Sequence, residues 1–135
     1  MPRAAINTAA ANTIAGPWSH GVRVGPFLFT SGQVPINPAT NKVDSADVAL
    51  QVRQSLQNVE AILTAGGATT GDIAKVTVYL RDYADFPAVN EEYERHFAAP
   101  YPARTLVTVA SLPVIQGVLC RCIIEAIAYV GPTGE

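Results

Sequence analysis

Charged side chains are scarce in this chain of 135 residues: Asp, Glu, Lys and Arg make up only 15% of it, against about one quarter in typical soluble proteins. Hydrophobic residues make up 49%, which excludes an intrinsically disordered chain. Because so few charges cover an isolated surface poorly, the composition favours an oligomer. The length predicts one domain spanning residues 1–135.

A basic cluster is also missing. Nine Lys plus Arg stand against eleven Asp plus Glu, giving a net charge of -2. A protein that grips duplex nucleic acid neutralises phosphates with a patch of Lys and Arg. Nucleic acid is therefore a poor partner for this chain.

Long apolar runs and a secretory signal are absent from the sequence. No run approaches the ~18 residues that a membrane helix needs, so no membrane partner is expected. The first forty-three residues contain Arg3, Arg23 and Lys42 but no acid, which weakly resembles a transit peptide. Because Gly16, Pro17 and Trp18 already look like folded chain, we expect a cytoplasmic protein.

Cysteine and histidine are few, and their spacing does not match that of known metal sites. Cys120 and Cys122 are two residues apart, which places both on one face of a strand. With His20 and His96 they could supply four zinc ligands, but no CxxC or HxxxH spacing supports this. We expect the cysteines to be buried as small hydrophobic residues, the histidines to lie at the surface, and no metal to be bound.

The first half of the chain predicts a hairpin followed by a loop and a helix. Strands over 22–24 and 27–31 flank the turn Gly25-Pro26, and residues 32–40 are rich in turn formers. From Asp47 the apolar residues recur at helical spacing until Gly66-Gly67 ends the pattern. Ser45 or Asp47 is the expected cap. The buried stripe is Val48, Val52, Leu56, Val59 and Leu63.

The second half predicts three strands and one helix. Residues 73–80 alternate as a half-buried strand, with Ala74, Val76, Val78 and Leu80 on one face. Asp85 is the expected cap of a second helix, on which Glu91, Glu92 and Glu94 remain solvated. Strands follow over 103–109 and 118–130. The order β-β-α-β-α-β-β fits an α+β domain with two helices on one face of a single mixed sheet.

Two charges stand where the strand pattern demands apolar side chains. Arg104 shares a strand face with Leu106 and Thr108, and Glu125 lies on the face opposite the cysteines. Arginine offers a planar fork that grips a carboxylate with two hydrogen bonds. A glutamate in an apolar setting is suited to orient or activate water. The alternative is that Arg104 and Glu125 form a buried ion pair with no further role.

Familiar catalytic motifs are missing. The sequence has no GxSxG, HExxH, P-loop or GxGxxG pattern. Ser31 ends a strand, where ligands are often bound, but no histidine is adjacent in the sequence to activate it. Ser31 is better interpreted as a hydrogen-bonding residue than as a nucleophile.

Seven short stretches occur in one order between Ala15 and Tyr129. They are Ala15-Gly16-Pro17-Trp18, Phe29-Thr30-Ser31-Gly32-Gln33-Val34-Pro35, Gln54-Ser55-Leu56-Gln57-Asn58-Val59, residues 71–80, Val89-Asn90-Glu91, Pro100-Tyr101-Pro102-Ala103-Arg104-Thr105 and Ile124-Glu125-Ala126-Ile127-Ala128. In this order they resemble the Rid family of reactive intermediate deaminases, also called YjgF-like or L-PSP-like proteins.

This resemblance implies a chorismate-mutase-like fold assembled as a homotrimer with clefts between subunits. It implies hydrolysis of 2-aminoacrylate-type enamines and 2-imino acids to 2-keto acids and ammonia, with no metal or organic cofactor. In this sequence Arg104 would hold the substrate carboxylate and Glu125 would position the attacking water. Ser31, Gly32 and Asn90 would line the cleft.

Three departures from the family pattern bear on substrate choice. Trp18 replaces the usual tyrosine, Leu106 replaces a frequent cysteine, and the stretch from Val114 to Ile124 is longer than usual. Leu106 and Trp18 would add apolar walls to the substrate site, so we expect a preference for imines with apolar side chains.

Two other functions remain open at this point. One is a non-catalytic regulatory trimer that binds a small carboxylate through the same arginine. The other is the ribonuclease or translation-inhibitor activity attributed to some relatives, which the acidic balance and the lack of a histidine acid/base pair disfavour.

Overall fold

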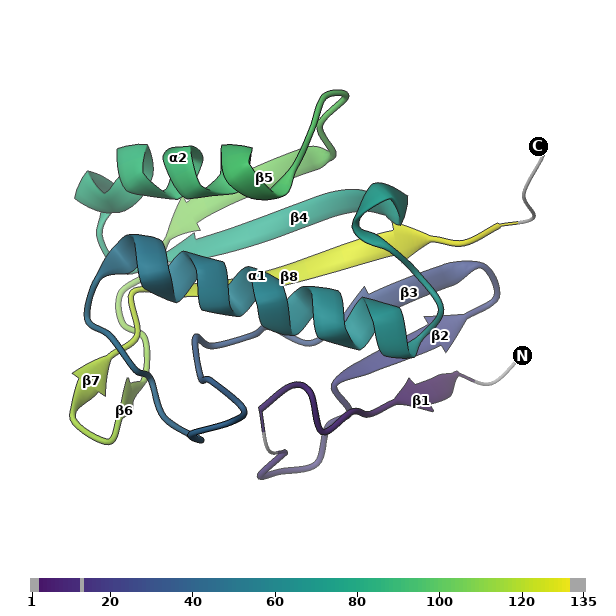
Figure 1. Ribbon diagram of the computed structural model, residues 1–135, viewed down its shortest axis with the longest axis horizontal. Helices are drawn as coiled ribbons and strands as arrows, with labels where there is room; N and C mark the ends of the chain where they lie inside the picture. The colour runs from purple at the N-terminus through teal and green to yellow at the C-terminus, as the bar shows by residue number, and fades with distance from the viewer. Residues whose placement is uncertain (1–2, 13, 132–135) are drawn as a thin grey trace.

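Two helices cover one face of a six-stranded mixed sheet in the computed structural model, which describes residues 3–12 and 14–131 (Figure 1). The helices are α1 (Val48–Ala65) and α2 (Phe86–His96). The strand order is β1 (Ala4–Ile6), β2 (Gly21–Val24), β3 (Phe27–Thr30), β8 (Cys122–Tyr129), β4 (Ile73–Leu80) and β5 (Ala103–Thr108). Only β4 and β5 are parallel among these neighbours. The predicted α+β architecture is confirmed.

The hairpin of β2 and β3 forms where the sequence predicts it. Gly25 turns the chain with a φ of 57°, a left-handed conformation that glycine adopts without steric cost. The sequence pattern missed β1, which pairs with β2 through only three residues. A strand this short shows too little alternation for its period to be recognised.

Helix α1 supplies most of one side of the core. Its cap is Asp47, whose carboxylate accepts a hydrogen bond of 3.1 Å from the backbone N–H of Leu50. Gly67, with a φ of 90°, follows the end of the helix. The predicted stripe is confirmed: Val52, Leu56, Val59 and Leu63 are buried, and Val48 packs at the edge of the core.

Strand β4 departs from simple alternation at its first residues. Its register with β8 shifts between Ile73 and Lys75, so Ile73 is buried and Ala74 is exposed. The prediction that Ala74 shares the buried face of Val76 was wrong, because a β-bulge reverses the alternation locally.

Two acidic residues near α2 behave differently from expectation. Asp85 precedes the helix, but its carboxylate accepts bonds of 2.9 and 2.8 Å from the guanidinium of Arg121 and does not cap the helix. Glu92, expected in solvent, is only 2% exposed and accepts bonds of 3.0 and 3.1 Å from Arg53 of α1. In both cases an arginine distant in sequence compensates the burial of a carboxylate.

The predicted strand over 118–130 is interrupted. A separate hairpin of β6 (Val114–Ile115) and β7 (Val118–Leu119) precedes β8, with Gln116 and Gly117 both at positive φ in its turn. The long Val114 to Ile124 stretch therefore contains a hairpin in addition to the start of β8. The buried amide of Gln51 binds the chain at the interruption, accepting from the N–H of Arg121 at 2.7 Å and donating to the carbonyl of Leu119 at 3.0 Å.

Both cysteines are buried, as predicted, and neither forms a disulfide. Burial raises the pKa of Cys120 to about 11 and that of Cys122 to about 12, so both thiols stay protonated at neutral pH. Within residues 3–12 and 14–131, no helix has the length and hydropathy to cross a membrane.

The two histidines differ in exposure. His20 is buried, and its ring nitrogens contact the N–H of Thr8 and the carbonyl of Asn12. His96 is largely covered between Glu60 of α1 and Glu92 of α2. The prediction of surface histidines was wrong for His20, whose ring contacts backbone groups of another segment, whereas His96 is intermediate in exposure.

Candidate active site

Arg104 and Glu125 lie on opposite faces of the sheet. Arg104 pairs with Val76, whose side chain is buried beneath the helices, so Arg104 lies on the helix-covered face. Glu125 pairs with Thr77, on the other face. The two residues do not form the ion pair that the sequence had left open as an alternative. Their charges are available for separate tasks.

The Arg104 guanidinium lies over two aromatic rings at an open cavity. Its central carbon is 4.8 Å from the ring centre of Tyr93 and 5.8 Å from that of Phe86. The cavity has a volume of about 390 Å³ and is lined by Asn90, Tyr93, Glu94, Tyr101 and Arg104. The structure therefore brings together Asn90 and Arg104, two of the residues predicted for the site. A guanidinium can bind a carboxylate through two parallel hydrogen bonds, so a cavity of this size beside Arg104 could hold a small carboxylate ligand.

Leu106 takes a different position from the one expected. It shares the face of Arg104, but it packs against the hydrophobic core and does not line the cavity. Trp18 lies before β2 and is 53% exposed. The two apolar walls predicted for one ligand are thus not assembled within a single chain.

Gly32, another predicted site residue, lies beside Glu125, and Ser31 precedes it in the chain. A Cβ added to Gly32 would lie 2.7 Å from Cγ2 of Ile123 and 3.9 Å from Oε1 of Glu125, so only glycine fits without displacement. The Ser31 hydroxyl donates a bond of 2.7 Å to the carbonyl of Ser19, and no histidine side chain activates it in the structure. This geometry supports a hydrogen-bonding role for Ser31 more than a nucleophilic one.

Tyr79 is a neighbour of Glu125 that the sequence interpretation missed. It is half-buried on the open face of the sheet, two residues after Thr77 on β4, and Thr77 pairs with Glu125. Burial raises the pKa of the Tyr79 phenol, and the negative charge of Glu125 raises it further. The alternation of Thr77 and Tyr79 in the sequence was the available signal.

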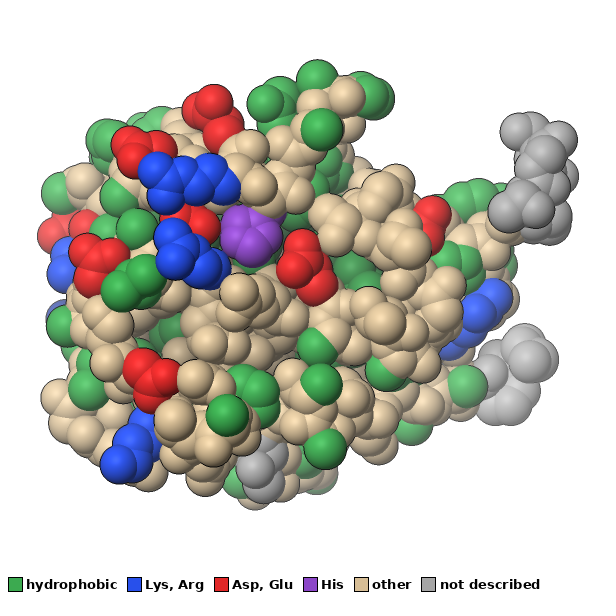
Figure 2. All heavy atoms as spheres, viewed as in Figure 1, with side chains coloured by type: hydrophobic (Ala, Val, Ile, Leu, Met, Phe, Trp, Pro, Cys, Tyr) green, Lys and Arg blue, Asp and Glu red, His purple; other side chains and the backbone are tan. Residues whose placement is uncertain are grey.

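Outside these two groups, charged side chains gather over α1 and α2 (Figure 2). Arg53 and Arg95 approach Glu92 at 3.0 and 3.4 Å, and His96 lies 3.5 Å from it. Bonds from Arg53 lower the pKa of Glu92, and the Glu60 carboxylate raises the pKa of His96. Because these charges neutralise one another, the cluster joins the helices and offers no free cation to a ligand.

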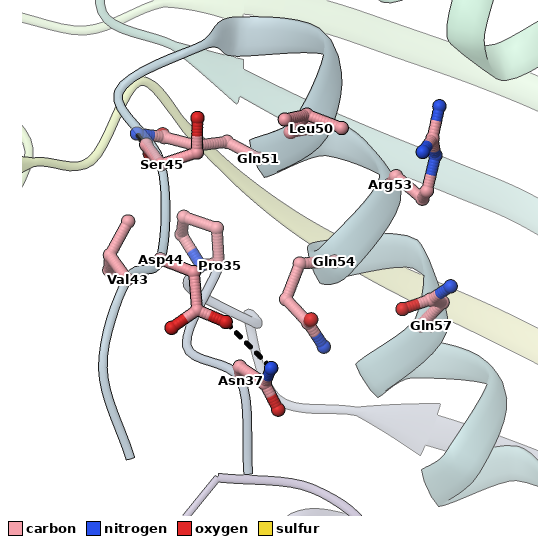
Figure 3. Close-up of a pocket in the computed structure, with 10 residues that line it drawn as sticks. All are labelled: Pro35, Asn37, Val43, Asp44, Ser45, Leu50, Gln51, Arg53, Gln54 and Gln57. Carbon is pink, nitrogen blue, oxygen red and sulfur yellow. Dashed lines mark hydrogen bonds between the residues drawn. The ribbon is translucent and has the colours of Figure 1, made fainter. Parts of the chain in front are cut away.

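A further hollow lies between α1 and the loop before it (Figure 3). Its volume is about 190 Å³, and Asn37 donates a bond of 2.7 Å to Asp44 at its edge. None of the site residues predicted from the sequence lines it. In the described part of the chain, no group of three or more His, Cys, Asp or Glu residues could hold a metal ion.

Comparison with known proteins identifies close relatives of this chain. Residues 8–130 match the family described as "Endoribonuclease L-PSP". A 2-iminobutanoate/2-iminopropanoate deaminase of Escherichia coli K12 is 50% identical over 111 residues, covering 80% of this chain and 86% of that protein. A RutC family protein of Haemophilus influenzae is 47% identical over 127 residues, covering 91% and 94% of the two chains.

Solved structures agree with the sequence comparison. The YjgF gene product of E. coli superposes with a TM-score of 0.85 at 46% identity, covering 93% of this chain and 98% of the other. E. coli TdcF with bound serine has a TM-score of 0.85 at 42% identity and the same coverage. The similarity in sequence and in fold extends over nearly the whole domain, so this chain belongs to the L-PSP family, which includes the YjgF, RutC and Rid proteins.

Proposed function

We propose that this protein is a cytoplasmic imine deaminase that hydrolyses 2-imino acids and 2-aminoacrylate-type enamines to 2-keto acids and ammonia. One observation carries the proposal: the Arg104 guanidinium lies at an open cavity without a carboxylate partner among the residues that the structure describes. The deaminase name of an E. coli relative at 50% identity supports the reaction type.

The chemistry needs positioning more than a strong nucleophile, because an imine carbon is already electrophilic. Arg104 binds the substrate carboxylate with two N–H groups. Glu125 accepts a proton from water as the water oxygen bonds to the imine carbon and the C=N electron pair moves to nitrogen. The protonated Glu125 then returns this proton, through water, to the nitrogen. In the resulting carbinolamine the hydroxyl proton passes to nitrogen, the C=O bond forms and the C–N bond breaks to release ammonia, so one imine and one water give one keto acid and one ammonia.

Arg104 and Glu125 lie on opposite sheet faces, which supports a site shared between two subunits. Both groups reach one ligand only if neighbouring copies each supply one of them. The open sheet face carries an exposed aromatic cluster of Phe27, Phe29 and Tyr129, with ring centres 6.4 and 5.3 Å apart for the two pairs that Phe27 forms. Such a patch favours burial between subunits. We propose a homotrimer with the clefts at its interfaces.

Ammonia release tests the function. An imino acid is generated in place by an amino acid oxidase, and ammonia and keto acid are measured with and without the protein. A deaminase accelerates release well above spontaneous hydrolysis. An unchanged rate, despite binding of the keto acid product, would reject the enzyme in favour of a protein that binds a small carboxylate without turnover.

The alternative is a regulatory protein that binds a small carboxylate without turnover. The solved structure of TdcF with serine shows that one relative binds a small amino acid, which favours this second candidate. Ribonuclease activity has less support, because His20 is engaged with backbone groups and His96 with two carboxylates. Neither imidazole is free to act as an acid or base on RNA.

A further inference from the structure

Arg104 is held differently from the paired arginines of this protein. Arg53, Arg95 and Arg121 each approach a carboxylate at 3.4 Å or less. Among residues 3–12 and 14–131, no ion pair includes Arg104. Its contacts are aromatic, with Tyr93 at 4.8 Å and Phe86 at 5.8 Å.

Aromatic support leaves the hydrogen-bonding edge of a guanidinium free. The negative face of the ring attracts the cation, while the N–H groups remain in the guanidinium plane. A neighbouring Asp or Glu would instead occupy those N–H groups and compete with an incoming carboxylate. The two rings can therefore fix Arg104 without neutralising it.

The rings themselves are firmly placed. Tyr93 is only 5% exposed and packs against Phe97 with ring centres 4.5 Å apart. Phe86, one residue before Pro87, stacks on Tyr83 at 5.2 Å. Both rings belong to α2, which is tied to the rest of the fold by Arg53 bound to Glu92 and by Arg121 bound to Asp85 next to the helix start. Aromatic rings on a packed helix fix the position of a cation more precisely than rings on a loop would.

We propose that Tyr93, with Phe86 beside it, is a positioning residue that holds the Arg104 guanidinium ready to grip a carboxylate in the cavity. The ligand class rests on the proposed function: a small 2-keto or 2-imino acid. Tyr93 acts through Arg104 and is not itself a catalytic residue. Because its ring already restricts the Arg104 side chain in the free protein, Arg104 loses less conformational entropy when a ligand binds.

The ring, and not the hydroxyl, is the active part of Tyr93. Its buried hydroxyl has no hydrogen-bond partner in the described part of the chain. A phenylalanine at this position keeps the aromatic face and removes the unsatisfied group. Tyr93→Phe and Tyr93→Leu therefore separate the two parts of the side chain.

The first measurement is calorimetric binding of 2-oxobutanoate to the full-length protein. Tyr93→Phe should keep Kd within about twofold of wild type, whereas Tyr93→Leu should raise it roughly two- to thirtyfold, the range of a cation–π contact. Phe97→Leu is the comparison variant: it removes the ring that packs on Tyr93 but is not beneath Arg104, so it should raise Kd less than Tyr93→Leu does. Thermal unfolding establishes that each variant is folded. Equal Kd values for wild type and Tyr93→Leu, or equal weakening in Tyr93→Phe and Tyr93→Leu, would overturn the proposal.

A second measurement does not depend on the ligand. The Arg104 side-chain signals, assigned by comparison with Arg104→Lys, should show an upfield ring-current shift in the NMR spectrum of wild type, Tyr93→Phe and Phe97→Leu. The shift should shrink in Tyr93→Leu. Its absence in wild type rejects the aromatic support, whatever the binding result. Failure of wild type to bind 2-oxobutanoate while the shift is present would instead reject the proposed function.

Discussion

At the scale of single residues, Arg104 and Glu125 divide the proposed chemistry between binding and catalysis. Arg104 has a cavity and an aromatic support, and Glu125 has the close backbone of Gly32 and the ring of Tyr79 around it. Because their surroundings are independent within one chain, each role can be tested without disturbing the other.

Replacing Arg104 with Lys should lower kcat/KM about 10- to 100-fold. A lysine keeps the charge but loses the planar fork, and one charge-assisted hydrogen bond to the substrate is lost. Steady-state deamination kinetics measure the effect, and unchanged thermal unfolding shows that the fold survives. Turnover close to that of wild type would exclude the carboxylate-binding role.

Replacing Glu125 with Gln should lower kcat by roughly 10²- to 10⁴-fold, the usual contribution of a general base. Glutamine preserves the shape of the side chain but cannot accept the water proton. Binding of 2-oxobutanoate should persist, since Arg104 is untouched. Loss of binding and of stability together would indicate a structural role for Glu125.

Substrate preference is a prediction that concerns Leu106 and Trp18. If a neighbouring subunit brings Trp18 to the cavity of Arg104, imines made from leucine or methionine should be preferred over that from alanine. Each buried methylene contributes about 0.8 kcal/mol, so the ratio of kcat/KM should shift by about one to two orders of magnitude. The same series is measured with a Leu106→Cys, Trp18→Tyr double variant. A profile that this variant leaves unchanged would show that the two positions do not set the preference.

At the scale of elements, the contact between α1 and α2 depends on ionised side chains. His96 of α2 faces Glu60 of α1 and Glu92 of its own helix, with Arg53 of α1 nearby. The carboxylates raise the pKa of His96 above its usual 6.5, and Arg53 lowers that of Glu92 below its usual 4.5.

The free energy of unfolding should therefore be highest between about pH 4.5 and pH 6.5 and should fall on either side of this range. Because the pKa of His96 is raised in the folded protein, its contribution to stability is fully present below pH 6.5. This contribution is lost as the pH rises through the pKa of His96 in the folded protein. A lowered Glu92 pKa stabilises the fold above 4.5, and this contribution is lost as the pH falls through the folded value. Urea unfolding from pH 5 to 9 measures the first effect. His96→Gln should flatten the decline above pH 6.5, and a decline that persists unaltered would assign it to other groups.

At the scale of the whole molecule, one face of the sheet is covered by helices and the other is open. Phe27, Phe29 and Tyr129 are about two-fifths exposed on that open face. Because only 15% of the residues are charged, few charged side chains are available to cover this apolar face. Association between copies would cover this face, and the proposed trimer places Glu125 of one copy near Arg104 of another.

Light scattering should give three times the chain mass of 14.2 kDa. Phe29→Lys places a charge in the aromatic cluster and should dissociate the assembly, because a buried unpaired charge is strongly unfavourable. Deamination should then be lost although Arg104 and Glu125 remain. An active monomer would refute the cleft between subunits, and Phe27→Tyr serves as a control that keeps the aromatic face.

Local periodicity was enough to predict the hairpin, α1 with a cap at Ser45 or Asp47, the limits of β4 and the opposite faces of Cys122 and Glu125. These features depend on residues a few positions apart, whose spacing the sequence displays directly. Only the tertiary structure decided the burial of Glu92 by Arg53, 39 residues away, and the pairing of Asp85 with Arg121, 36 residues away. It likewise decided the support of Arg104 by Tyr93. Whether a charged side chain is buried, paired or free depends on which side chains distant in sequence contact it in the fold. The spacing of residues along the sequence does not predict these contacts.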